Sequence, residues 1–156
     1  LNLIPDGGVP LIPKDEKFCN QATSDLRYVH DYLKARGIKL VVFLTPLPQR
    51  HSKIIMEIDY GRKFYEDVKK ELATLSPDII VEDYLNPSLV TFDDREFIDQ
   101  SHAGEVIALR ILNDLTQKNP DLEAYVDVPF IQKELETCAN KPMCIHGFEK
   151  YLIPER

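Results

Sequence analysis

Two short apolar runs, each preceded by an amphipathic segment, constrain the fold of this chain more than any other feature. The runs are "IKLVVFL" and "DIIVEDY". Continuous apolar runs rich in β-branched residues are typical of strands buried on both faces, which occur in parallel sheets covered by helices. The sequence therefore predicts parallel strands at Leu40–Leu44 and Ile79–Glu82, adjacent or nearly so. The expected core contains Val41, Phe43, Ile80 and Leu109.

Apolar residues at helical spacing predict four helices. The first, in "SDLRYVHDYLKARG", is expected to be capped by Ser24 or Asp25 and ended by Gly37. The second lies in "YGRKFYEDVKKELATLSP" and ends before Pro77, and the third lies in "AGEVIALRIL". The fourth starts near Pro129, whose fixed φ suits a first helical turn.

Alternation of helices with buried strands predicts an α/β domain with three layers, helix, parallel sheet and helix. A length of 156 residues favours a single domain. We expect an extended entry segment at 1–22, an α/β region at 23–118, and a C-terminal helix with an irregular extension of the same domain at 119–156. Two strands are few for such a sheet, and the chain begins with Leu1 rather than methionine. The expectation is therefore a cut or processed chain that carries the later part of a larger sheet.

Charge argues against nucleic acid as a partner, and hydropathy argues against a membrane-spanning helix. The net charge is -7 and no cluster of Lys and Arg occurs, whereas nucleic-acid-binding proteins present a basic face. The longest apolar runs are far shorter than the roughly 20 residues that a membrane-spanning helix needs. We expect neither nucleic acid as a partner nor a transmembrane segment.

The stretch "REFIDQSHAGEVIALRIL" holds the main candidate site, Asp99 three residues before His102. A carboxylate and an imidazole at this spacing can meet across a tight turn, so Asp99 can accept the Nδ1 proton and leave Nε2 for a nucleophile's hydroxyl. The alternative is structural. Asp99 or Ser101 caps the following helix, and His102 is an ordinary first-turn residue.

The order of elements around this motif resembles the SGNH, or GDSL-type, hydrolase superfamily. The resemblance covers about Ser24 to Leu115, through "SDLRYVHDYLKARGIKLVVFLTPLPQ", "FYEDVKKELATLSPDIIVEDYL" and "FIDQSHAGEVIALRIL". The opening "IPDGGVPLI" is similar to a turn in the envelope branch of the superfamily, which includes proteins of alginate acetylation and D-alanine transfer. The resemblance implies a flavodoxin-like three-layer fold in which Asp99 and His102 take the acid and base places of a catalytic triad.

What the resemblance implies for function is an ester hydrolase or O-acyltransferase that acts on an acylated envelope glycan or a small ester. It implies an extracytoplasmic or cell-envelope location and no cofactor. The alternative is a non-catalytic SGNH-like module that binds a glycan or a partner protein.

The sequence departs from the family pattern at the nucleophile. The family's G-D-S block and its oxyanion glycine and asparagine blocks do not occur in this chain, and the residue after His102 is Ala103 followed by Gly104. No serine has the strand-then-turn setting of such a nucleophile. The serines considered are Ser24, Ser52, Ser76, Ser88 and Ser101. We expect the nucleophile on a segment outside these residues that completes the domain, or a module that has lost catalysis.

Two histidines outside the motif differ in their expected roles. Arg50 and His51 follow the first predicted strand, at the carboxyl end where α/β sheets gather ligands, so they are candidate substrate-binding residues, with an ordinary exposed loop as the alternative. His30, beside Asp31 on the first helix, is expected to be a surface residue.

Two clusters of potential metal ligands favour other roles. "CANKPMCIHG" contains Cys138, Cys144 and His146 without a standard zinc spacing, which leaves a Cys138–Cys144 disulfide, free thiols or metal binding open, with metal the least favoured. The acidic group Asp93, Asp94 and Glu96 is expected to be a solvated loop rather than a cation site. The sequence thus predicts no metal site.

Overall fold

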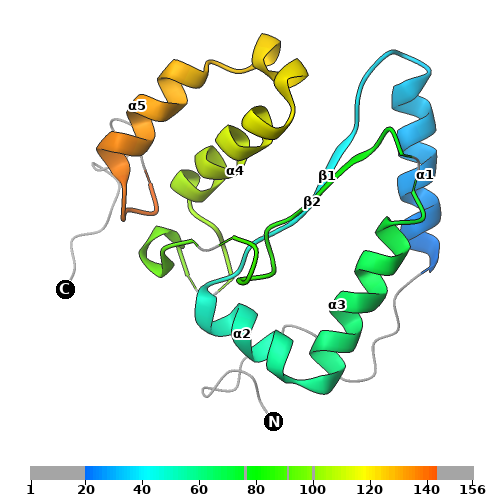
Figure 1. Ribbon diagram of the computed structural model, residues 1–156, viewed down its shortest axis with the longest axis horizontal. Coiled ribbons are helices and arrows are strands. Elements are labelled where there is room, and N and C mark those ends of the chain that lie inside the picture. The colour runs from blue at the N-terminus through cyan, green and yellow to red at the C-terminus, as the bar shows by residue number, and fades with distance from the viewer. Residues whose placement is uncertain (1–19, 76, 91, 100, 144–156) are drawn as a thin grey trace. The chain divides into compact units, whose positions relative to one another are not determined.

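The protein is described here from a computed structural model, which covers residues 20–75, 77–90, 92–99 and 101–143. Strand β1 (Val41–Leu44) pairs in parallel with β2 (Ile80–Asp83), and Val41 lies opposite Ile80. Figure 1 shows the two strands side by side. The predicted positions of the strands and their parallel pairing are confirmed.

Helices precede and follow each of the two strands along the chain. They are α1 (Asn20–Lys34), α2 (Gln49–Glu57), α3 (Asp59–Leu72), α4 (Glu105–Lys118) and α5 (Val128–Cys138), with two short 3-10 helices, η1 (Asp94–Glu96) and η2 (Pro120–Tyr125). The described residues therefore form a mixed helix and strand structure with a two-stranded parallel sheet, in agreement with the α/β class.

The strands are less buried than their sequence predicts. Phe43 is 39% exposed and Val81 is 40% exposed, so the prediction that both strands are covered on both faces is wrong. Phe43 packs edge-on against Tyr84, with ring centroids 6.0 Å apart. The other three predicted core residues, Val41, Ile80 and Leu109, are partly buried. The physical reason is that the described residues contribute only two strands, so little surrounds the side chain of Phe43.

Helix α1 ends as predicted and begins earlier than predicted. Gly37 has φ +71° and donates its N–H to the Lys34 carbonyl, while Ile38 donates to the Leu33 carbonyl at 3.1 Å. This pair of bonds closes a helix through a left-handed residue, a conformation that glycine adopts without strain. The predicted cap at Ser24 is wrong, because α1 already includes Asn20 and its second turn contains Ser24.

Helix α2 was not predicted, and its N-terminus shows why. The backbone N–H of Gln49 donates to a carboxylate oxygen of Asp94 at 2.7 Å, and the Gln49 side chain donates to the Phe92 carbonyl. A cap supplied from 45 residues away in the chain leaves no local signature. At the junction with α3, a Cβ on Gly61 would lie 2.5 Å from the Ile55 carbonyl oxygen, so the close approach of these helices requires glycine.

The described chain groups into two compact units. One contains 20–45 and 52–86, and the other contains 46–51 and 87–143. The division falls inside the region expected at 23–118. Residues 1–19 of the expected entry segment lie outside the described residues, and 20–22 are helical rather than extended.

The second unit has a helical core. Helices α4 and α5 are in contact, and the buried Val106 and Cys138 pack with Leu109 and Leu135. Helix α5 is capped by Asp127, whose side chain accepts from the backbone N–H of Phe130 at 3.0 Å. The predicted helix near Pro129 is confirmed.

Candidate functional site

The Asp99 and His102 pair lies on a loop whose two ends are joined by backbone hydrogen bonds. Phe97 and Ala103 form an isolated antiparallel bridge. The Ile98 N–H donates to the His102 carbonyl at 2.9 Å, and the Gly104 N–H donates to the Glu96 carbonyl at 3.0 Å. Helix α4 begins only at Glu105, so the structural alternative, in which His102 lies in its first turn, is wrong on this point.

The base of this loop is anchored by a buried ion pair. The Glu96 side chain is 0% exposed and accepts two hydrogen bonds from Arg110 of α4, at 2.6 and 2.7 Å. The backbone N–H of Asn140 donates to the same carboxylate at 3.1 Å. These bonds compensate for the loss of water around a buried charge. Hydrogen bonding to Glu96 raises the pKa of Arg110.

Gly104 lets the loop pack closely against the rest of this unit. A Cβ at this position would lie 2.3 Å from the Glu96 carbonyl oxygen and 2.3 Å from the Pro142 carbonyl oxygen. Both obstacles are backbone atoms, so no side chain could move aside. Packing therefore explains why glycine follows Ala103, where the sequence departs from the family pattern.

At the tip of the loop, Asp99 both accepts backbone hydrogen bonds, as a cap does, and contacts the imidazole of His102. One of its carboxylate oxygens accepts from the backbone N–H groups of Ser101 at 2.8 Å and His102 at 2.9 Å. The other carboxylate oxygen is 2.7 Å from Nδ1 of His102. The backbone N–H of Ser101, then the His102 side chain, then the His102 N–H hold the pKa of Asp99 well below its usual value. The aspartate caps the turn 99–102 rather than α4, and it also binds the imidazole.

The pairing fixes the chemistry of the imidazole. An ionised carboxylate only accepts hydrogen bonds, so the Nδ1 atom carries a proton, and in the neutral imidazole Nε2 presents its lone pair. The His102 side chain is 72% exposed, and Nε2 makes no hydrogen bond within the described residues. The arrangement can accept a proton from a hydroxyl that approaches from outside the loop.

Among the serines considered, only Ser101 contacts His102 within the described part of the chain. Its hydroxyl lies 3.3 Å from Nδ1 and 3.2 Å from an Asp99 oxygen, which is the wrong side of the ring for a nucleophile. Ser24 and Ser88 are exposed, and Ser52 is buried in α2. Ser76 lies outside the described residues.

The predicted substrate-binding residues lie at the start of α2. Arg50 is exposed, and His51 is half-buried. The Nδ1 atom of His51 is buried without a hydrogen-bond partner among the described residues. Neither residue lines the cavity of about 300 Å³ that lies between α3 and the strands.

The acidic group before the motif is not the solvated loop that the sequence predicts. Glu96 is fully buried in the ion pair described above, so for this residue the prediction is wrong. Asp94 caps α2. Asp93 forms an ion pair with Arg95, whose side-chain and backbone hydrogen bonds lower the pKa of Asp93 to about 2. These carboxylates cap a helix or form ion pairs. The sequence pattern alone does not distinguish such carboxylates from ones that are only hydrated.

His30 is also misassigned by the sequence, because its side chain is only 7% exposed. Its Nδ1 lies 3.0 Å from Asp31 and its Nε2 lies 3.3 Å from Asp78. Asp78 also pairs with Lys34 at 2.9 Å. His30 lies on the inner side of α1, but the polar Asp31 next to it in the sequence made an exposed position look more plausible.

The cysteines and acidic residues give no metal site within the described part of the chain. Cys138 is disulfide-bonded, and the other cysteines, Cys19 and Cys144, lie outside the described residues together with His146. Within the described ranges, no group of three or more His, Cys, Asp or Glu residues is arranged to hold a metal ion.

No family model, no curated protein and no solved structure matches this chain significantly. Among the described residues, no helix combines the length and the apolar character needed to cross a membrane.

Proposed function

We propose that this chain supplies the general base and its orienting acid to an SGNH-like ester hydrolase or O-acyltransferase. In this proposal His102 takes the proton of a serine hydroxyl, and Asp99 holds the imidazole in the required tautomer. The serine and the oxyanion donors come from a segment outside these residues. The substrate is an acylated envelope glycan or a small ester.

The contact between Asp99 and Nδ1 of His102 carries the proposal. Its length of 2.7 Å and the exposed position of the ring meet the two geometric requirements of a general base, namely a fixed tautomer and a reachable Nε2. A helix cap alone requires only the backbone bonds of Asp99. The resemblance in element order and the parallel pairing of β1 with β2 add support for a three-layer fold of SGNH type.

The proposed location outside the cytoplasm has separate support. Cys138 is disulfide-bonded, and disulfides persist mainly in oxidising compartments. A cell-envelope glycan is accessible in such a compartment.

The second candidate is a non-catalytic module of the same fold that binds a glycan or a partner protein. It is favoured by the absence of a serine beside Nε2 within the described residues. The two candidates make opposite predictions for a single substitution.

The deciding experiment measures hydrolysis of chromogenic acetyl and butyryl esters by the longest natural form of the protein. His102→Ala is expected to lower turnover by roughly 10²- to 10⁴-fold, because the general base is lost. The matched control is Arg62→Ala, which breaks an exposed ion pair of 2.7 Å and should leave turnover unchanged. Hydrolysis that His102→Ala does not alter would contradict the assigned role. No hydrolysis by the unaltered protein, together with glycan binding, would favour the module.

A further inference from the structure

The cavity between α3 and the two strands lies in the unit that does not contain Asp99 and His102. It has a volume of about 300 Å³, at the lower end of the range for small-molecule sites. It is partly open to solvent, so a ligand can extend out of it.

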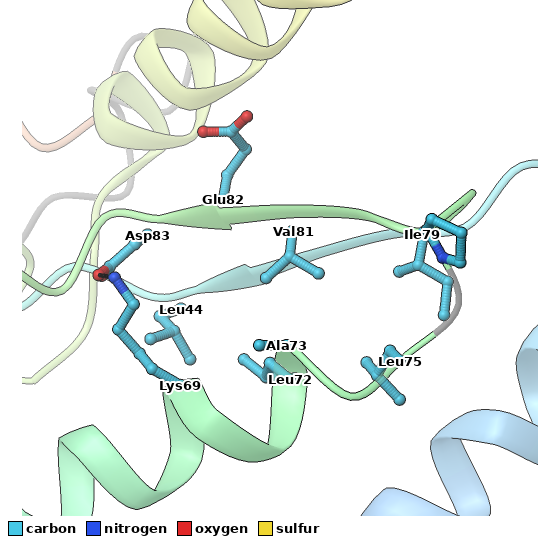
Figure 2. A pocket seen from close by; sticks show the side chains of 10 residues that line it. Leu44, Lys69, Leu72, Ala73, Leu75, Ile79, Val81, Glu82 and Asp83 are labelled. Carbon is cyan, nitrogen blue, oxygen red and sulfur yellow. Dashed lines mark ion pairs between the residues drawn. The ribbon is translucent and has the colours of Figure 1, made fainter.

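Most of the cavity wall is aliphatic. Figure 2 shows side chains of α3 and of the following turn facing side chains of β1 and β2 across this space. The aliphatic lining residues are Leu44, Leu72, Leu75, Pro77, Ile79 and Val81. Glu82 belongs to the same wall, and its side chain points away from α3 (Figure 2). A wall of this composition favours an uncharged hydrocarbon chain over water.

One end of the cavity is polar and already organised. Lys69 of α3 lies 3.1 Å from Asp83 at the carboxyl end of β2. Asp83 also accepts from the Tyr65 hydroxyl and from the backbone N–H of Leu85 at 3.2 Å. Hydrogen bonding to Asp83 raises the pKa of Lys69, so the amine stays protonated at neutral pH.

The polar end selects among ligand head groups. A lysine ammonium has three N–H donors, of which Asp83 and the Tyr65 hydroxyl take two, so one remains for a ligand. A second carboxylate would lie next to Asp83 and be repelled, whereas a neutral carbonyl oxygen can accept a hydrogen bond from Lys69 without that cost.

We infer that the space between α3 and the β1–β2 pair is a binding site for a short uncharged acyl chain, with the carbonyl of its ester or amide at Lys69. The chain occupies the aliphatic part of the cavity, and the small group beyond the carbonyl points out of it. This inference does not depend on the proposed hydrolase function, because binding at this site requires neither Asp99 nor His102.

Methyl hexanoate is a suitable probe, since it joins a short aliphatic chain to a neutral ester carbonyl. Binding is followed by NMR on the methyl groups of Leu44, Leu72 and Ile79, in the protein carrying His102→Ala so that no ester is consumed. Saturable shifts of these methyl groups are expected. Each fully buried methylene contributes about fourfold to affinity, and methyl acetate lacks four of them, so it should bind up to about 250-fold more weakly. Hexanoate, which is charged, should also bind more weakly than the ester.

The matched pair of variants tests the role of the lysine. Lys69→Met keeps the aliphatic stem, leaves Asp83 with its bonds to Tyr65 and the backbone, and should weaken methyl hexanoate binding by about tenfold. Lys63→Met on the same helix removes an exposed lysine paired with Asp67 and should have no effect.

Three results would overturn the inference. The first is the absence of saturable shifts at the cavity methyl groups. The second is equal binding of hexanoate and its methyl ester, which would remove the carbonyl contact with Lys69. The third is a dependence of the same methyl signals on protein concentration without ligand, which would identify a second copy of the chain as the occupant.

Discussion

The two histidines that pair with aspartate, His30 and His102, differ in almost every respect except the pairing itself. His30 is 7% exposed and lies between two carboxylates, those of Asp31 and Asp78. His102 is 72% exposed and contacts a single aspartate, Asp99. In the described residues, both ring nitrogens of His30 are occupied, whereas Nε2 of His102 is free.

A contact between histidine and aspartate does not by itself indicate catalysis. A buried imidazole with both nitrogens bonded satisfies its own polar atoms and stabilises the packing around it. An exposed imidazole with one nitrogen bonded gains little stability from the pair, because exposed ion pairs contribute little. The second arrangement leaves a proton acceptor within reach of a substrate, so the contact of His102 with Asp99 supports the proposed function only together with the exposure of the ring.

The largest expected effect comes from the anchor beneath the His102 loop. Glu96→Ala removes the partner of Arg110 and the acceptor for Asn140, and it should lower the free energy of unfolding by about 2–3 kcal/mol, a value reduced because Arg110 is 37% exposed. The loop bonds of His102 should loosen as well. Urea unfolding and the NMR signals of the two histidines measure both effects.

Glu96→Ala has two controls, a substitution of another glutamate and the signals of the other histidine. Glu136→Ala changes an exposed glutamate of α5 and should alter stability by less than about 0.5 kcal/mol. The imidazole signals of His30, which lies in the other unit, should not change in Glu96→Ala. Unchanged stability, or equal changes at both histidines, would show that Glu96 does not act as the anchor of this loop.

A smaller effect separates the two histidines directly. His30→Ala leaves a cavity beside the inner face of α1 and removes two contacts to carboxylates. It should lower the free energy of unfolding by about 1–3 kcal/mol. His102→Ala should cost less than about 0.5 kcal/mol, since its side chain is mostly in water. Urea unfolding of the two variants gives the answer. A cost for His102→Ala as large as that for His30→Ala would mean that the exposed pair is a structural element.

The sequence predicts the parts of this structure that local patterns determine. Parallel pairing of the two apolar runs, the stop of α1 at Gly37 and the start of α5 near Pro129 follow from β-branched runs, from a left-handed glycine and from the fixed φ of proline. The contact of Asp99 with His102 was also expected from their spacing. The sequence signal for each of these features lies within a short stretch of the chain, although the pairing of β1 with β2 joins distant residues.

The parts that the sequence did not predict depend on residues far apart in the chain. The N-terminus of α2 is capped by Asp94, and the carboxylate of Glu96 is neutralised by Arg110. In the sequence, both acids look like members of a solvated loop. The burial of His30 depends in the same way on Asp78, which is distant in sequence. None of these three contacts joins neighbours in the sequence, so the local pattern gave no sign of the pairing.

The smallest expected effect is the acid titration of Asp99, and it tests whether the carboxylate binds the imidazole or only caps the turn. The pKa of Asp99 is held below the usual 3.8 by the backbone N–H of Ser101, then by the His102 side chain, then by the His102 N–H. Because the carboxylate is favoured by folding, these bonds stabilise the loop above the usual pKa and are lost as the pH falls through the lowered one. In His102→Ala the backbone bonds remain, so the pKa of Asp99 should rise only part of the way toward 3.8. The pKa of Asp93, lowered to about 2 by Arg95, should not move and is the internal control. Carboxyl carbon NMR across the acid range measures both residues in one titration. If the pKa of Asp99 is the same with and without the imidazole, the aspartate is a turn cap alone, and the proposed orientation of His102 fails.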